Sequence, residues 1–138
     1  MASENIERFN VGALRAVAFL YKALPNTVTV DHSTLLRSTE SSDGSVMVEL
    51  SSGGEHGTIL WLYKNGFVDG NLIESKPLQG DQKAAIMSAQ LSSKALRILQ
   101  RPEQNAGGVP LGEYAVASAF GERESVAAEL VMRRLLGS

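Results

Sequence analysis

Residues 13–24 carry the feature that most constrains the fold, a helical pattern of apolar side chains on one broad face. Apolar residues recur at intervals of three and four, so this face must be buried against other parts of the chain. The apolar positions are Ala13, Leu14, Ala16, Val17, Ala18, Leu20, Tyr21 and Leu24. Arg8, Arg15 and Lys22 are seven residues apart, which predicts a solvated flank of the same helix. Pro25 predicts its end, because the residue before a proline disfavours the helical conformation.

Two further helices are marked by residues that typically begin or end a helix. Residues 59–63 form an apolar block that could be a buried strand. We favour a helix over 55–65, because Asn65-Gly66 supplies an end signal in which glycine adopts the left-handed conformation. The second helix contains Ala95, Leu96, Ile98 and Leu99. Ser92 or Ser93 can cap its start, and it is expected to end before Pro102. The other expected segments are a strand at 27–30, a short helix at 34–37, a polar loop at 38–45, a strand or short helix at 46–50, a strand at 67–68 that turns at Asp69-Gly70-Asn71, a polar excursion at 72–87 and a returning strand at 89–91.

The C-terminal part predicts a pair of helices broken near Gly121. Acidic residues at 122 and 124 and basic residues at 133 and 134 match the dipole of the second helix. Its apolar arc is too wide for a solvated helix, so it must pack either on the same chain or on a second copy. The arc consists of Ala127, Ala128, Leu130, Val131, Met132, Leu135 and Leu136. Residues 103–112 contain several glycines and prolines and are expected to be a linker.

Composition narrows the class of protein. The 138 residues, 43% of them hydrophobic, suit a globular chain of one domain, or one domain with an appendage. The absence of cysteine excludes disulfides, a thiol nucleophile and thiolate metal sites. No apolar run reaches membrane-spanning length and the start lacks a basic signal region, so we expect a cytoplasmic protein without membrane contact. The net charge of −2 conceals a mildly basic middle, where residues 54–101 carry six basic and four acidic side chains.

The order of the expected elements matches a winged-helix domain, in which a three-helix core is closed by a two-stranded hairpin called the wing. The stretch 57–68 resembles the junction between helix and strand in many small winged-helix proteins. Residues 90–99 resemble their common ending Leu-Thr-x-Lys-Gly-x-x-x-Leu, with Ser92 in place of threonine and Ala95 in place of glycine. The resemblance covers about residues 9–102 and is to small winged helix-turn-helix proteins of bacterial or phage type with a helical tail.

This resemblance implies an α+β, mostly helical fold, with a winged-helix domain at 1–102, a linker at 103–112 and a C-terminal tail at 113–138. In such domains the helix before the wing enters the major groove, and basic side chains on the wing contact phosphate. Three further cations lie three and four residues apart on the expected helix after the wing, although cations there are also typical of a solvated face. The candidate DNA-contacting residues are His56, Thr58, Lys64, Asn65, Lys76, Lys83, Lys94, Arg97 and Arg101.

The resemblance therefore implies a DNA-binding protein that regulates transcription, and the apolar tail suggests a homodimer. The residues expected at an interface are Trp61, Leu130, Val131 and Leu135. The alternative is a protein–protein interaction module of phage or mobile-element origin without DNA binding, which the acidic net charge and the arginine-free 55–65 helix favour.

Enzyme motifs are missing, so we expect no catalysis. The chain has no Gly-x-Ser-x-Gly elbow, no P-loop and no His-Glu-x-x-His pattern. The two histidines, His32 and His56, are 24 residues apart, and neither has the spacing of a metal ligand set. No metal and no cofactor are expected.

Overall fold

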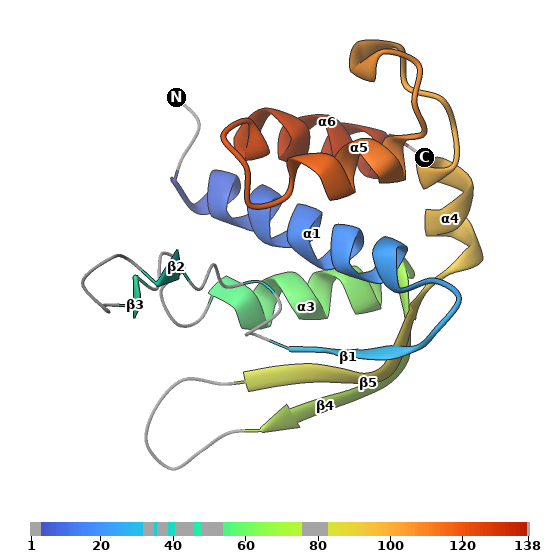
Figure 1. Cartoon of the computed structure of the whole chain (residues 1–138). Helices are drawn as coiled ribbons and strands as arrows, with labels where there is room; N and C mark the ends of the chain where they lie inside the picture. The colour runs from blue at the N-terminus through green and yellow to red at the C-terminus, as the bar shows by residue number, and fades with distance from the viewer. Residues whose placement is uncertain are drawn as a thin grey trace.

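Helix α1 (Glu4–Ala23) is the central element, with the other helices and a sheet packed around it (Figure 1). The computed structural model describes residues 4–31, 35, 39–40, 46–47, 54–75 and 83–137. The apolar face predicted for this helix is buried, and Leu14, Val17 and Leu20 are almost completely inaccessible. The predicted end before Pro25 is confirmed. The fold is α+β and mostly helical, as expected.

A three-stranded antiparallel sheet closes one side of the molecule. Its strands are β1 (Val28–Val30), β4 (Val68–Ser75) and β5 (Lys83–Leu91), in the order β1-β5-β4. The strand predicted at 27–30 is thus confirmed. Strands β4 and β5 form a long hairpin, and β1 pairs with the second strand of that hairpin.

The hairpin is longer than the sequence pattern predicts. The expected turn at 69–71 is wrong, because β4 continues through it to Ser75 and absorbs Gly70 as an irregularity in the strand register. Gly70 has φ +146°, and a β-carbon there would lie 2.6 Å from Cγ2 of Ile86. The polar excursion expected at 72–87 is wrong at both of its ends, because residues 72–75 belong to β4 and pair with residues 83–86 of β5.

Helices α3 (Gly54–Lys64) and α4 (Ser93–Leu99) confirm the two helices marked by end signals. Gly66 adopts φ +77°, the left-handed conformation expected after α3. Ser92 is the N-cap of α4, because its Oγ accepts a hydrogen bond from the Ala95 N–H at 3.2 Å. The same Oγ donates to the Gly66 carbonyl at 2.6 Å, so one hydroxyl joins the end of α3 to the start of α4.

Two short strands belong to the segment between β1 and α3. Strand β2 (Thr39–Glu40) pairs with β3 (Val46–Met47), so the first two residues of the ambiguous 46–50 segment are extended. The polar loop expected at 38–45 and the helix expected at 34–37 lie mostly outside the described residues. Leu35 is described and completely buried.

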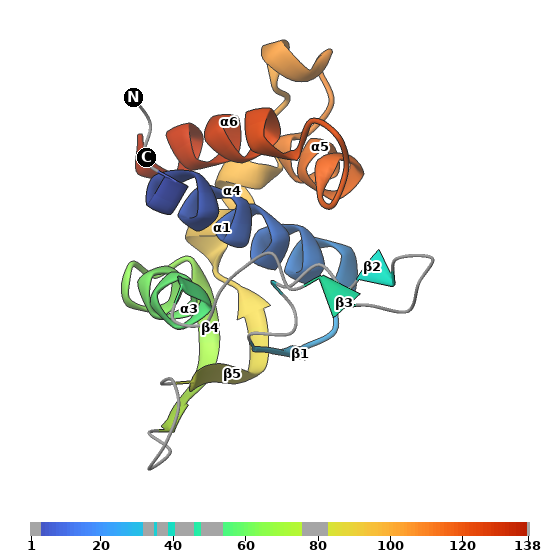
Figure 2. The same cartoon turned by 90° about the vertical axis from the view of Figure 1, so that its left-hand side faces the viewer.

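Two C-terminal helices, α5 (Leu111–Ser118) and α6 (Glu124–Leu136), cover the other side of α1. Figure 2 shows α5 and α6 on one side of α1, with α3 and the sheet on the opposite side. The break predicted near Gly121 is confirmed. Helix α5 approaches α1 closely at Gly112, where a β-carbon would lie 2.2 Å from Cε1 of Tyr21.

The apolar arc predicted for α6 packs on this chain except at its last residue, because Leu136 is 64% exposed. The side chains of Leu130, Val131 and Leu135 are buried at relative exposures of 7%, 0% and 1%. They belong to the core together with α1 and offer no surface to a second copy. These three residues therefore cannot form the predicted interface, and self-association itself stays a prediction.

The expected linker is held in place by backbone contacts. Its first half contains the single-turn helix η1 (Gln104–Ala106), and Pro102 and Pro110 pair as an isolated antiparallel bridge. The Leu111 N–H donates to the Arg101 carbonyl at 3.0 Å. Because α5 begins at Leu111, the last two residues of the expected linker are helical.

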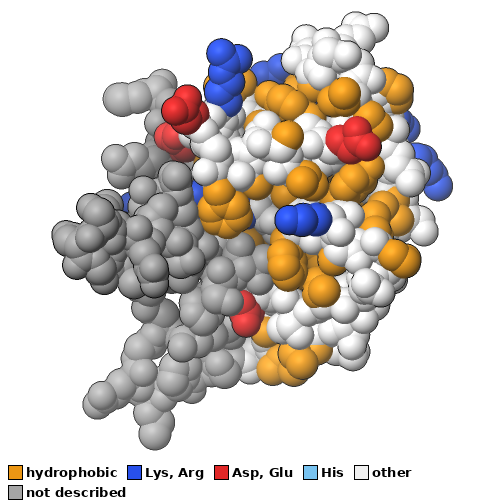
Figure 3. All heavy atoms as spheres, viewed as in Figure 1, with side chains coloured by type: hydrophobic (Ala, Val, Ile, Leu, Met, Phe, Trp, Pro, Cys, Tyr) orange, Lys and Arg blue, Asp and Glu red, His pale blue; other side chains and the backbone are white. Residues whose placement is uncertain are grey.

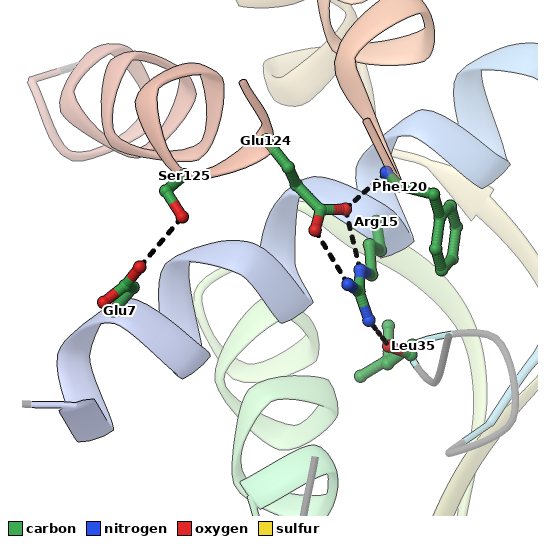
Figure 4. Close-up of polar contacts among 6 residues, drawn as sticks. All are labelled: Glu7, Arg15, Leu35, Phe120, Glu124 and Ser125. Atoms are coloured by element: carbon green, nitrogen blue, oxygen red, sulfur yellow. Dashed lines mark hydrogen bonds and ion pairs between the residues drawn. The ribbon is translucent and has the colours of Figure 1, made fainter. Parts of the chain in front are cut away.

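A buried ion pair connects α1 to α6 (Figure 4). Arg15 donates through Nε and Nη2 to the two carboxylate oxygens of Glu124, at 2.8 and 2.7 Å. Its Nη1 donates to the Leu35 carbonyl at 2.7 Å, and the Phe120 N–H donates to Glu124. The predicted solvated position of Arg15 is wrong, because Glu124, Phe120 and Leu35 contact its guanidinium and the residue is only 3% exposed. The other two cations of that flank, Arg8 and Lys22, are exposed as predicted.

Candidate nucleic-acid interface

The C-terminal end of α3 presents two of the predicted DNA-contacting residues to solvent. Lys64 and Asn65 are exposed, and the Asn65 side-chain amide donates to the Trp61 carbonyl at 2.8 Å. The same carbonyl also accepts the Asn65 backbone N–H at 3.0 Å, so the side chain adds a second bond there and loses one donor that a base edge would need. Lys64 forms no side-chain bond with the described residues, so all three of its donors remain available for phosphate.

The other two candidates on α3 differ in what the structure describes. Thr58 is 3% exposed, and its Cγ2 lies 3.4 Å from where a β-carbon of Gly12 would be. The predicted base-reading role of Thr58 is wrong, because this face of α3 packs on α1. His56 belongs to α3, but its side chain lies outside the described parts of the chain.

Lys94 joins the cations of α4 to the end of α3. Its Nζ donates to the Asn65 carbonyl at 3.2 Å and lies 4.4 Å from the centre of the Phe67 ring. A cation–π contact at an exposed site contributes about 0.5–1 kcal/mol, enough to hold the side chain in this position. An ammonium has three donors, so two remain available for a phosphate oxygen.

Arg97 and Arg101 extend this positive surface along and beyond α4. Both are exposed, Arg97 in the last turn of the helix and Arg101 two residues after its end. Among the described residues, no carboxylate forms an ion pair with either arginine, with Lys94 or with Lys64. We refer to Lys64, Lys94, Arg97 and Arg101 as the basic strip.

The lysines expected on the wing fall at the edge of what the structure describes. Lys76 lies outside the described residues, between the two strands of the hairpin. Lys83 is the first residue of β5, and its side chain is not among those described. A role for these two lysines in contacting phosphate therefore remains a prediction.

Trp61 lies within an aromatic cluster of its own chain. The indole is partly buried, edge-on to the Phe9 ring at 5.1 Å and stacked on the Phe67 ring at 5.4 Å. Such pairs stabilise a fold by about 0.5–1.5 kcal/mol each beyond the buried area. Trp61 thus connects α1, α3 and the start of the hairpin, and only part of it remains accessible to a partner.

Two other kinds of site are absent from the described residues. No three His, Asp or Glu side chains of this part lie close enough together to hold a metal ion. No helix in the same residues is both long and apolar enough to span a bilayer.

Comparison with protein-family models, with curated proteins and with solved structures gave no match. Function is therefore inferred from the chain's own residues and geometry.

Proposed function

We propose that the chain is a winged-helix regulatory protein that binds duplex DNA through the basic strip. The arrangement of helix and hairpin supports the winged-helix part of this proposal. Helix α3 directly precedes the hairpin, and β1 pairs with the second hairpin strand to give the order β1-β5-β4. The hairpin thus extends from the sheet as a wing would, next to the end of α3.

The contact between Lys94 and the Asn65 carbonyl carries the DNA-binding part. This single bond of 3.2 Å places the cations of α4 beside the exposed end of α3. Lys64 and Lys94 then lie at the end of the element that would enter the groove, and Arg97 and Arg101 follow along and beyond α4; none of the four pairs with a carboxylate among the described residues. Phosphate contacts of this kind supply affinity and orientation, and they carry no sequence information.

The residues of α3 favour weak discrimination between sequences. Lys64 is the only described side chain near its end with a full donor set, since Asn65 is engaged with Trp61 and Thr58 is buried. Specific readout commonly depends on arginine paired with guanine or on a free amide paired with adenine. Helix α3 contains no arginine, and the amide of Asn65 is engaged with Trp61. We therefore expect binding that depends strongly on salt and weakly on sequence.

Fluorescence anisotropy of a labelled duplex at 50–200 mM KCl tests this proposal. If all four strip residues contact phosphate, log Kobs falls with log salt with a slope of about −3.6, so affinity drops about 150-fold over this range. The double variant Lys64→Gln/Arg97→Gln should reduce the slope to about −1.8.

The matched control is Lys22→Gln, which removes an exposed lysine from α1 outside the strip. It should leave both affinity and slope unchanged. Equal effects of the strip and control variants would mean that only overall charge matters, and the strip would lose its role. No binding at 50 mM KCl would overturn the proposal and favour the alternative, a protein-interaction module.

A further inference from the structure

A cavity of about 400 Å³ lies where the end of α4, helix η1 and the C-terminal end of α6 meet. In Figure 1 the segment between α4 and α5, which contains η1, lies above the end of α4. Its lining includes three arginines, Arg101, Arg133 and Arg134, against one carboxylate, Glu103. The cavity therefore carries an excess of positive charge in a chain whose net charge is −2.

Glu103 holds one of these arginines in place. Arg134 donates to it through Nε at 2.6 Å and through Nη2 at 3.0 Å, and the Asn105 N–H donates at 3.1 Å. The hydrogen bond from Arg134 is the main cause that lowers the pKa of Glu103, so the carboxylate stays ionised and paired at neutral pH. Nη1 of Arg134 has no partner among the described residues, which leaves it free to bind an anion.

The other two arginines are less constrained by the fold. The Arg101 guanidinium forms no hydrogen bond or ion pair with any residue that the structure describes. Arg133 contacts Glu129 at 3.1 Å, in a pair whose side chains are 59% and 68% exposed. Exposed pairs of this kind are weak and easily exchanged, so Arg133 can turn towards an incoming anion.

The shape and lining of the cavity indicate the size and chemistry of a ligand. Guanidinium groups match the geometry of phosphate and bind it through two parallel hydrogen bonds. Pro102 adds an exposed apolar ring to the lining, and a volume near 400 Å³ falls within the range of small-molecule sites. A bare inorganic ion would leave that apolar surface uncovered.

We propose that this cavity binds a small organic phosphate monoester. Arg101 and Arg134 hold the phosphate, with Arg133 as a third donor, and the organic group lies against the ring of Pro102. This inference does not depend on DNA binding, because the cavity is built by α4, η1 and α6 without α3 or the hairpin.

Isothermal titration calorimetry of the full chain with phenyl phosphate tests the proposal, with phenol and inorganic phosphate as comparison probes. Phenyl phosphate should bind saturably with one molecule per chain, more tightly than either comparison probe. Arg101→Gln should weaken its binding at least tenfold and leave thermal unfolding unchanged, because this guanidinium has no partner to lose. Arg97→Gln, the matched arginine on α4 outside the cavity, should bind the probe like the unaltered chain.

Three results would overturn the proposal. They are the absence of saturable binding, equal weakening by Arg97→Gln and Arg101→Gln, and binding of inorganic phosphate as tight as that of phenyl phosphate. The two arginine variants also separate this site from the proposed DNA interface. Arg97→Gln should weaken DNA alone, whereas Arg101→Gln should weaken both DNA and phenyl phosphate, so failure of one proposal leaves the other testable.

Discussion

Removing either partner of the buried Arg15–Glu124 pair should strongly destabilise the fold. The side chains are 3% and 10% exposed, so water cannot replace a missing partner. Loss of one member of such a pair costs about 3–5 kcal/mol, a large part of the 5–15 kcal/mol typical of a whole domain. We therefore expect Arg15→Met and Glu124→Leu each to lower the free energy of unfolding by about 4 kcal/mol.

The double variant separates the pair energy from the other bonds that the two side chains make. Replacing both charges with apolar groups removes the unpaired charge but leaves the Leu35 carbonyl and the Phe120 N–H unbonded. The Leu35 carbonyl is buried and the Phe120 N–H is partly buried, and an unbonded group of this kind costs about 1–3 kcal/mol, so the double variant should also lose about 4 kcal/mol. The cycle then gives a coupling energy of about 4 kcal/mol between Arg15 and Glu124.

Urea unfolding followed by tryptophan fluorescence provides the measurement. Trp61 is the sole tryptophan and packs on Phe9 and Phe67, so its emission reports loss of the core around α1. With a slope of about 2 kcal/mol per molar urea, a loss of 4 kcal/mol shifts the midpoint by about 2 M.

A surface ion pair on α6 supplies the control. Glu129 and Arg133 lie one helical turn apart at 3.1 Å and are mostly exposed, so Glu129→Gln should cost about 0.5 kcal/mol at most. Single variants of the buried pair that lose less than about 1 kcal/mol, or that add without coupling, would refute the reasoning.

Three further predictions concern packing, capping and pH. Gly112→Ala drives a methyl group into the Tyr21 ring and should destabilise the chain by about 1–3 kcal/mol in urea unfolding. Its control Gly57→Ala, where no atom lies within 4 Å, should stabilise by about 0.5–1 kcal/mol. Ser92→Ala should lower thermal stability by about 0.5–2 kcal/mol through loss of the N-cap, and an unchanged melting temperature would contradict the capping role. The pKa of Glu103 is lowered in the fold by its arginine partner, so its stabilisation is complete above its ordinary value of 4.5 and is lost as pH falls through the lowered value. Glu103→Gln should therefore flatten the decline of melting temperature below pH 4.5, and an identical acid profile in both proteins would disprove this assignment.

The helices were predictable because their signals are local. Periodic apolar residues determine α1, and Pro25, the Asn65-Gly66 pair and Ser92 determine helix boundaries through backbone geometry within a few residues. The length of the hairpin was not predictable in this way. Asp69-Gly70-Asn71 has the composition of a turn, and only pairing with β5 shows that Gly70 serves as an irregularity within a strand.

The contacts that position distant segments could be predicted least. Arg15 has the spacing of a solvated residue, and its partner Glu124 is 109 positions away, so no window of sequence relates them. The same holds for Arg134 and Glu103, which are 31 positions apart. From the sequence, Arg134 was expected to complement the helix dipole and Glu103 to belong to a linker. In the candidate interface, Lys94, Arg97 and Arg101 were predicted from their spacing and Lys64 from the resemblance to winged-helix proteins, whereas the burial of Thr58 depends on the packing of α3 on α1.

The position of α6 against α1 has a consequence for synthesis of the chain. Helix α1 leaves the ribosome before α6, which covers one side of it and begins only at Glu124. At 5–20 residues per second, the intervening stretch of about 100 residues takes about 5–20 s to translate. During that interval the apolar side of α1 and the charge of Arg15 have no native cover. A chain interrupted before α6 would therefore expose the side of α1 that packs on α6 to chaperones and proteases. Completion of α6 would cover this side.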